Sequence, residues 1–506
     1  MAAVESSAIL PAESAQSVEH FDVVIVGAGL SGIGAAYHLQ QECPARSFAI
    51  LEGRNASGGT WDLFRYPGVR SDSDMFTLGY RFRPWQEAKA IADGPSILNY
   101  VRETARESGI DRKIRYGHQV TRASWSSKDS AWMVEATKVE GGTARFRCNF
   151  LYMCSGYYDY SAGYMPGWPG MEKFRGRIVH PQKWPEDLDY EGKRIAVIGS
   201  GATAVTLVPA MATKAAHVTM VQRSPTYILA RPSEDVIANW LRKRLSARLA
   251  YAIVRWKNVL IGMYFYGLAR RKPAATKKGI LKLVRKELGP EYDVEKHFSP
   301  RYNPWDQRLC LVPDSDLFAT LRSGKASIVT DEIEAFTEKG LRLHSGEEID
   351  ADIIVTATGL KLKVLGGLKV AVDGVPIELA RSLTYKGMMY SDIPNLASAF
   401  GYTNASWTLK ADLTAEYVCR LLNYMDARGY DSCTPRKRDA DITEEPIVNF
   451  NSGYFLRSIA ELPKQGSKKP WKLYQNYALD MITLRFGNVD DGTMEFARLR
   501  NEKGAD

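Results

Sequence analysis

The sequence has few cysteines, and none of them stands in a recognisable pair. The six lie far apart, at Cys43, Cys148, Cys154, Cys310, Cys419 and Cys433. There is no CxxC motif and no zinc-ligand spacing, which argues against a disulfide framework and a structural zinc site. We therefore expect reduced thiols, a cytoplasmic protein and no bound metal.

The N-terminus lacks positive charge. Its first twenty residues contain three Glu and no Lys or Arg, whereas a secretory signal begins with positive charge and continues into a long apolar run. We interpret residues 1–16 as a flexible N-terminal extension.

Acidic residues are missing from residues 236–286, which contain 14 Lys and Arg. Taking these 14 from the 67 basic residues of the chain leaves 53 against 58 acidic ones, so this segment supplies the formal net charge of +9. A charge confined to one segment does not predict nucleic acid as a partner. The uncharged stretch 258–269 inside it has 12 residues, and a spanning helix needs about 20.

Two strand–loop–helix units share one pattern. A β-rich apolar run at 21–26 precedes GAGLSG at 27–32, and a second run at 194–198 precedes GSGATA at 199–204. Further strands are expected at 48–51, 150–153, 218–222 and 352–356. Alternating strands and helices predict an α/β fold with two Rossmann-like domains.

Glycine-rich loops in this context bind dinucleotides, because the backbone can approach a pyrophosphate that rests on the following helix N-terminus. One such loop alone is often only a tight turn, but two in the same context favour two nucleotides. The residues we expect to take part are Gly27, Gly29 and Gly32 in the first loop and Gly199, Gly201 and Thr203 in the second.

The residue that ends the next strand indicates which nucleotide each loop holds. Glu52 lies 25 residues after Gly27; a carboxylate there bonds a ribose diol and repels a 2′-phosphate. Arg223 lies 24 residues after Gly199, and a guanidinium fits a phosphate bidentately. The first loop should hold FAD or NAD and the second NADP, with Ser224 as a further donor. A solvated surface charge remains the alternative for Arg223.

Two longer motifs carry a family resemblance. Residues 58–72 read GGTWDLFRYPGVRSD, and residues 174–185 read FRGRIVHPQKWP. They resemble the GGxWxxxxYPGxxxD and FxGxxxHxxxWP signatures of Baeyer–Villiger monooxygenases. Stretches such as YNPWDQRLCLVP and GYTNASWTLKADL are similar to the ethionamide-activating branch, and the resemblance covers nearly the whole chain after the N-terminal extension.

The resemblance implies an enzyme that uses FAD, NADPH and O2. Through a flavin C4a peroxide it would convert ketones to esters or lactones and oxidise sulfides or thioamides to S-oxides. A flavin N- or S-oxygenase without Baeyer–Villiger activity is the alternative. A disulfide reductase would need a redox cysteine pair, and a non-catalytic nucleotide sensor would not need the arginine discussed next.

The resemblance also implies roles for individual residues. Arg308 matches the catalytic arginine, and Asp72 the carboxylate that orients it, although a helix cap is the alternative for Asp72. Gly59, Thr60 and Trp61 should lie along the flavin. The second motif supplies the linker residues Phe174, Gly176, His180, Trp184 and Pro185, with His180 coupling the two domains rather than acting as a base. Gln307 stands where many members have a lysine, which leaves more of the NADP preference to Arg223.

We expect an FAD-binding domain of residues 17–155 and 345–506, an NADP-binding domain of residues 156–344, and a helical insertion at 233–300. Apolar residues recur there at helical spacing, namely Leu241, Leu245, Leu249, Ile253, Trp256 and Leu260. We favour a lid whose apolar face covers the substrate tunnel. Peripheral membrane contact through residues 236–286 remains open.

Overall fold

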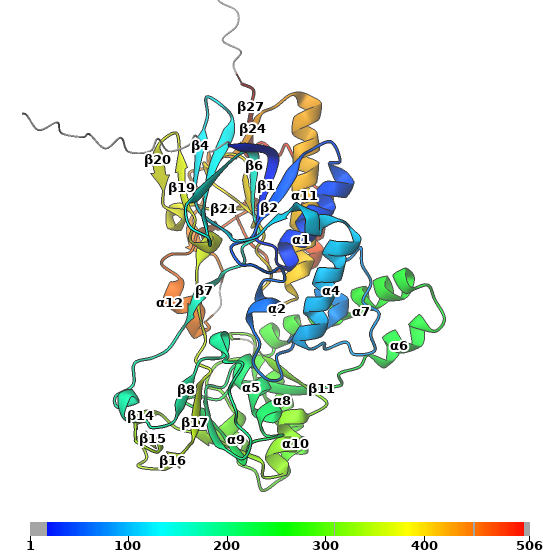
Figure 1. The fold of residues 1–506 in the computed structure, drawn as a ribbon. Helices are drawn as coiled ribbons and strands as arrows, with labels where there is room; N and C mark the ends of the chain where they lie inside the picture. Colours follow the sequence, from blue (N-terminus) through cyan, green and yellow to red (C-terminus); the bar gives the residue numbers. More distant parts are fainter. Residues whose placement is uncertain (1–17, 308, 449–450, 500–506) are drawn as a thin grey trace, which may run out of the picture.

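The computed structural model describes residues 18–307, 309–448 and 451–499 (Figure 1). The expected extension at residues 1–16 and the expected catalytic Arg308 therefore lie outside the described residues. The described chain forms two β-sheet units, the first mixed and the second wholly parallel, which are joined by short strands, with a group of helices at one side (Figure 1).

The first sheet is built around β1 (Glu19–Val26), which pairs in parallel with β2 (Phe48–Leu51) on one side and β6 (Thr143–Met153) on the other. The sheet continues through β3 (Ile114–Arg115), β4 (His118–Ser126), β5 (Ala131–Lys138), β19 (Lys369–Val372), β20 (Val375–Ile377) and β23 (Leu396–Ser398). The helices α1 (Leu30–Glu42) and α11 (Trp407–Arg428) lie side by side against it (Figure 1). Both helices bury apolar residues in the same core.

The second sheet has the order β13-β10-β9-β17-β8, and all of its neighbouring strands are parallel. These strands are β13 (Ala326–Thr330), β10 (His217–Gln222), β9 (Arg194–Ile198), β17 (Ile353–Thr356) and β8 (Arg177–Val179). Helix α5 (Ala202–Met211) follows β9 and buries most of its length in the second core, together with α10 (Asp316–Arg322). The α/β fold with two Rossmann-like units is confirmed, and all six strands read from the sequence are present.

The two units are linked by a pair of short strands. β7 (Tyr158–Gly163) continues from β6 towards β8, and β18 (Leu360–Leu362) continues from β17 back towards the first sheet. They pair antiparallel, between the two sheets in Figure 1. The chain therefore crosses between the two units at β7 and again at β18.

Helices fill the predicted stretch 233–300. They are α6 (Val236–Arg242), α7 (Ala247–Arg271), α8 (Pro273–Leu288) and α9 (Val294–Phe298). The helix α8 packs into the core of the second unit, whereas α7 places Tyr251, Val254 and Val259 in the core of the first. The helical segment is therefore shared between the units: in Figure 1, α6 and α7 lie to the side, and α8 and α9 lie within the second unit.

Four of the six residues of the apolar stripe that was expected to form the covered face of a lid are instead exposed, whereas Leu241 and Leu245 are half-buried. Leu249, Ile253, Trp256 and Leu260 are between 39% and 57% exposed. The opposite face of α7 is buried because it packs on α3 (Met75–Leu78), where Arg255 donates to backbone carbonyls. Among the described residues, no helix combines the length and apolarity that crossing a membrane requires.

Candidate functional site

A cavity of about 1200 Å³ lies between the two units and is lined by both. Ligand pockets commonly measure about 300–1,000 Å³, so this one can hold more than a single small ligand. Both glycine-rich loops border it. Parallel strands end at one edge of their sheet, and ligands bind beyond that edge. The strands β1 and β9 both end at this cavity, so the loops that follow them line it from two sides.

The first loop holds its shape through close backbone contacts. Gly27 has φ +105°, and a Cβ on it would lie 2.7 Å from the carbonyl oxygen of Cys154. A Cβ on Gly32 would lie 1.8 Å from the carbonyl oxygen of Gly27, so Gly32 serves packing and does not itself line the cavity. Gly29 faces Gly59 across the cavity edge. No side chain caps α1 at Gly29, which leaves the helix N-terminus available to an anion.

Glu52 follows β2 and is 7% exposed at the cavity wall. Its carboxylate accepts hydrogen bonds from the backbone N–H groups of Ala28 at 2.7 Å and Arg54 at 2.9 Å. Burial raises the pKa of Glu52, against the lowering effect of these two bonds. Each carboxylate oxygen has a second lone pair, so a ribose diol can bind while Glu52 still holds the loop.

Replacing Glu52 with alanine should leave the purified protein depleted of FAD. The change removes the expected ribose acceptor and two charge-assisted bonds of the loop, each bond worth about 1.5–3 kcal/mol. Flavin absorbance relative to protein absorbance measures the effect. Glu140→Ala, at an exposed turn away from the cavity, is the matched control, and equal FAD content in both variants would count against this role.

The second glycine-rich loop has the same backbone geometry as the first, but more space is open around it. Gly199 has φ +135°, and a Cβ on it would lie 2.4 Å from the carbonyl oxygen of Ala357. Nothing lies within 4 Å of a Cβ placed on Gly201, where α5 begins without a side-chain cap. Thr203, in the first turn of α5, also lines the cavity. The loop can therefore accept a second pyrophosphate.

Arg223 and Ser224 follow β10, in the position that Glu52 occupies after β2, and both line the cavity. The Arg223 side chain is exposed, and it makes no hydrogen bond or ion pair within the described part of the chain. The Ser200 hydroxyl donates to the backbone carbonyl of Ser224 at 3.0 Å and fixes this corner of the loop. A free guanidinium at this point fits the 2′-phosphate of NADP.

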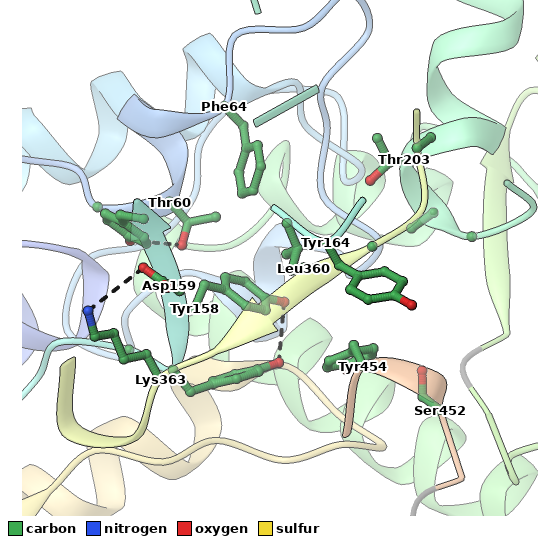
Figure 2. Close-up of a pocket in the computed structure, with 18 of the residues that line it drawn as sticks. Thr60, Phe64, Tyr158, Asp159, Tyr164, Thr203, Leu360, Lys363, Ser452 and Tyr454 are labelled. Carbon is green, nitrogen blue, oxygen red and sulfur yellow. Dashed lines mark hydrogen bonds and ion pairs between the residues drawn. The ribbon is translucent and has the colours of Figure 1, made fainter. Parts of the chain in front are cut away.

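Five tyrosines, which we call the tyrosine wall, line the cavity that both loops border, and they were not predicted from the sequence. Tyr157, Tyr158, Tyr160 and Tyr164 come from β7 and the residues next to it, and Tyr454 comes from α12 (Gly453–Ser458). Figure 2 shows Tyr158, Tyr164 and Tyr454 along the cavity. The Tyr160 and Thr60 hydroxyls lie 3.3 Å apart, and Lys363 pairs with Asp159 at 3.9 Å. The run YYDYSAGY after a buried strand was the available signal.

A buried polar atom along the cavity fits the expected cofactors. Ser155 lines the cavity, and its buried hydroxyl has no hydrogen-bond partner in the described chain. Ala405 and Trp407, at the start of α11, also line it. A helix N-terminus there favours negative charge on a bound ring system.

The remaining predicted residues divide into two groups. Thr60, Trp61, Asp72 and Gln307 line the cavity. The linker motif does not line the cavity. Its residues lie beside the second sheet and the 3₁₀ turn η3 (Pro181–Lys183), and they are Phe174, Gly176, His180, Trp184 and Pro185. The His180 ring sits where a Cβ on Gly163 of β7 would be, and burial lowers the pKa of His180.

Two protein-family models match the chain. Residues 25–90 match the NAD(P)-binding Rossmann-like domain, and residues 89–280 match the flavin-binding monooxygenase-like family. The FAD-containing monooxygenase EthA of Mycobacterium tuberculosis is 56% identical over 481 residues, which are 95% of this chain and 98% of that protein. EthA of Mycolicibacterium smegmatis is 53% identical over 483 residues, with 95% and 98% covered.

Solved structures share the fold at lower identity. Oxidized steroid monooxygenase bound to NADP superimposes with a TM-score of 0.74 at 21% identity, over 95% of this chain and 100% of that one. OTEMO in complex with FAD and NADP gives a TM-score of 0.72 at 21% identity, with the same coverage.

Proposed function

The chain belongs to the FAD-containing monooxygenases, and on that premise we propose that it is a Baeyer–Villiger enzyme that prefers NADPH. It is an FAD-dependent oxidoreductase, and its cofactors are FAD and NADP(H), as the sequence predicted. The proposed reactions are conversion of ketones to esters or lactones and oxidation of sulfides or thioamides to S-oxides.

One observation carries the proposal. The two glycine-rich loops open on one cavity, which Glu52 lines after β2 and Arg223 lines after β10. We assign the first loop and Glu52 to FAD, and the second loop, Thr203, Arg223 and Ser224 to NADP. FAD, reduced by NADPH, supplies the activation of O2 when it is bound.

The chain supplies charge, orientation and exclusion of water. Asp72 lines the cavity, and we assign it the task of orienting the cation of Arg308. That cation would stabilise the negative charge that develops on the substrate oxygen, which is commonly the largest contribution to such catalysis. Arg keeps its charge at working pH. The tyrosine wall and Trp61 line the same cavity as Asp72 and would restrict water there.

The alternative is a flavin N- or S-oxygenase that does not attack ketones. Both functions need the two loops, but only the Baeyer–Villiger reaction inserts oxygen next to a carbonyl carbon. A panel of linear, cyclic and aryl ketones, sulfides and a thioamide, with products identified by mass spectrometry, separates them. Ester or lactone products support the proposal, and S-oxides alone support the alternative.

A further inference from the structure

A second cavity, of about 460 Å³, lies apart from the nucleotide cavity and shares no lining residue with it. It lies between α1, the turn after α3, α7 and the segment 477–485. Four arginines line it, namely Arg81, Arg248, Arg255 and Arg485, and no Asp or Glu of the described chain does. We call it the arginine cavity.

The charges around the arginine cavity do not balance. Glu416 is shared by Arg81 and Arg485, and the Arg485 pair is bidentate at 2.6 and 2.7 Å. Asp412 contacts Arg255 at 3.4 Å and also lies 3.7 Å from His38. Arg248 is exposed and pairs with no residue that the structure describes. Two carboxylates thus face four guanidinium groups, and the cavity keeps an excess of positive charge.

Arg255 is the innermost of these groups. It is 5% exposed, and one of its Nη atoms donates to the carbonyls of Phe76 and Gly79 at 2.8 Å each. Its Nε has no hydrogen-bond partner within the described chain. A buried guanidinium donor without an acceptor is costly, and an anion entering the cavity would lower that cost.

The walls between the cations are aromatic. Tyr37 and Phe82 are stacked with ring centroids 3.6 Å apart, and Trp256 and Tyr477 lie 5.8 Å apart. The lining holds no Asn, Gln, Asp or Glu, so base edges and sugar hydroxyls would find few acceptors. Rings and cations together suit a ligand with an anionic head and an apolar body.

We propose that the arginine cavity binds an organic acid, with its carboxylate on the arginines and its aliphatic or aromatic body against the aromatic walls. The volume lies within the usual range of about 300–1,000 Å³ for a small-molecule pocket. This site is independent of the nucleotide cavity and of the proposed oxygenation. Binding therefore persists when FAD and NADP⁺ are bound.

Isothermal titration calorimetry of decanoate into the FAD-loaded full chain with excess NADP⁺ tests the proposal. Arg248→Glu should weaken one decanoate site by at least about tenfold, since a charge-assisted bond becomes a repulsion. Arg271→Glu, a matched reversal of an exposed cation at the other end of α7, should change Kd by less than about twofold. 1-Decanol, which has no charge, should not replace decanoate at this site.

A second variant tests the aromatic walls, and its FAD content shows whether the protein still folds. Trp256→Ala removes an aromatic wall at a position that is 39% exposed, and it should weaken decanoate while retaining FAD. Absence of saturable decanoate binding, equal Kd values for Arg248→Glu and Arg271→Glu, or equal binding of 1-decanol would each overturn the proposal. If the protein proved unable to oxidise ketones, these binding results would not change, so the two proposals are tested separately.

Discussion

Arg308→Ala is expected to lower the rate of ketone oxygenation by roughly 10²–10³-fold, the usual cost of removing one oxyanion donor. Reduction of the bound flavin by NADPH should proceed nearly as in the unaltered protein, because the proposed role of Arg308 begins after that step. Product formation measures the first effect. Anaerobic decay of the flavin absorbance measures the second.

The contrast between the two rates is what makes this variant informative. A variant that had merely lost its fold would lose FAD and both rates together. Arg301→Ala, an exposed arginine nearby in the sequence, should leave both rates unchanged. If Arg308→Ala lost flavin reduction and oxygenation equally, Arg308 would act in cofactor binding and not in the oxygenation step. Unimpaired oxygenation would remove its proposed role altogether.

Arg223→Ala should abolish most of the preference for NADPH over NADH. The guanidinium lies at the end of β10, lines the cavity and has no partner among the described residues. Losing one charge-assisted bond to the 2′-phosphate, at about 1.5–3 kcal/mol, should lower kcat/KM for NADPH by roughly 10–100-fold. The value for NADH should change little, since NADH has no 2′-phosphate.

The neighbouring residues sharpen this second prediction. Gln307 also lines the cavity and carries no charge, so Arg223 is expected to provide most of the discrimination. Arg231→Ala changes an exposed arginine that does not line the cavity and should leave the cofactor ratio as it was. A preference for NADPH that survives in Arg223→Ala would show that the 2′-phosphate is bound elsewhere.

Local sequence pattern was sufficient for the parts of the fold that are locally determined. The strands that end at Val26, Leu51 and Ile198 are short apolar runs with turn residues after them, and the sequence contains everything needed to recognise them. Glu52 and Arg223 were predicted because a parallel strand places the residue after it at the sheet edge. The structure places both residues at the cavity wall.

Features that depend on packing between distant segments were harder to predict. The apolar spacing on α7 indicated a buried stripe, but the helix buries Arg255 and exposes Trp256. Arg255 is tolerated there because carbonyls of α3 and Asp412 of α11 meet it. The tyrosine wall likewise forms only when β7 crosses between the two sheets. Neither arrangement has a periodic signal in the sequence.

Oxidation of a ketone under isotopically labelled dioxygen tests the proposed Baeyer–Villiger activity. With FAD-loaded protein and NADPH, we expect that ketone raises NADPH consumption and that mass spectrometry finds an ester or lactone carrying one labelled oxygen atom. If NADPH consumption responded to no ketone of the panel, and sulfoxide were the only labelled product from the sulfides, the protein would not be a Baeyer–Villiger enzyme.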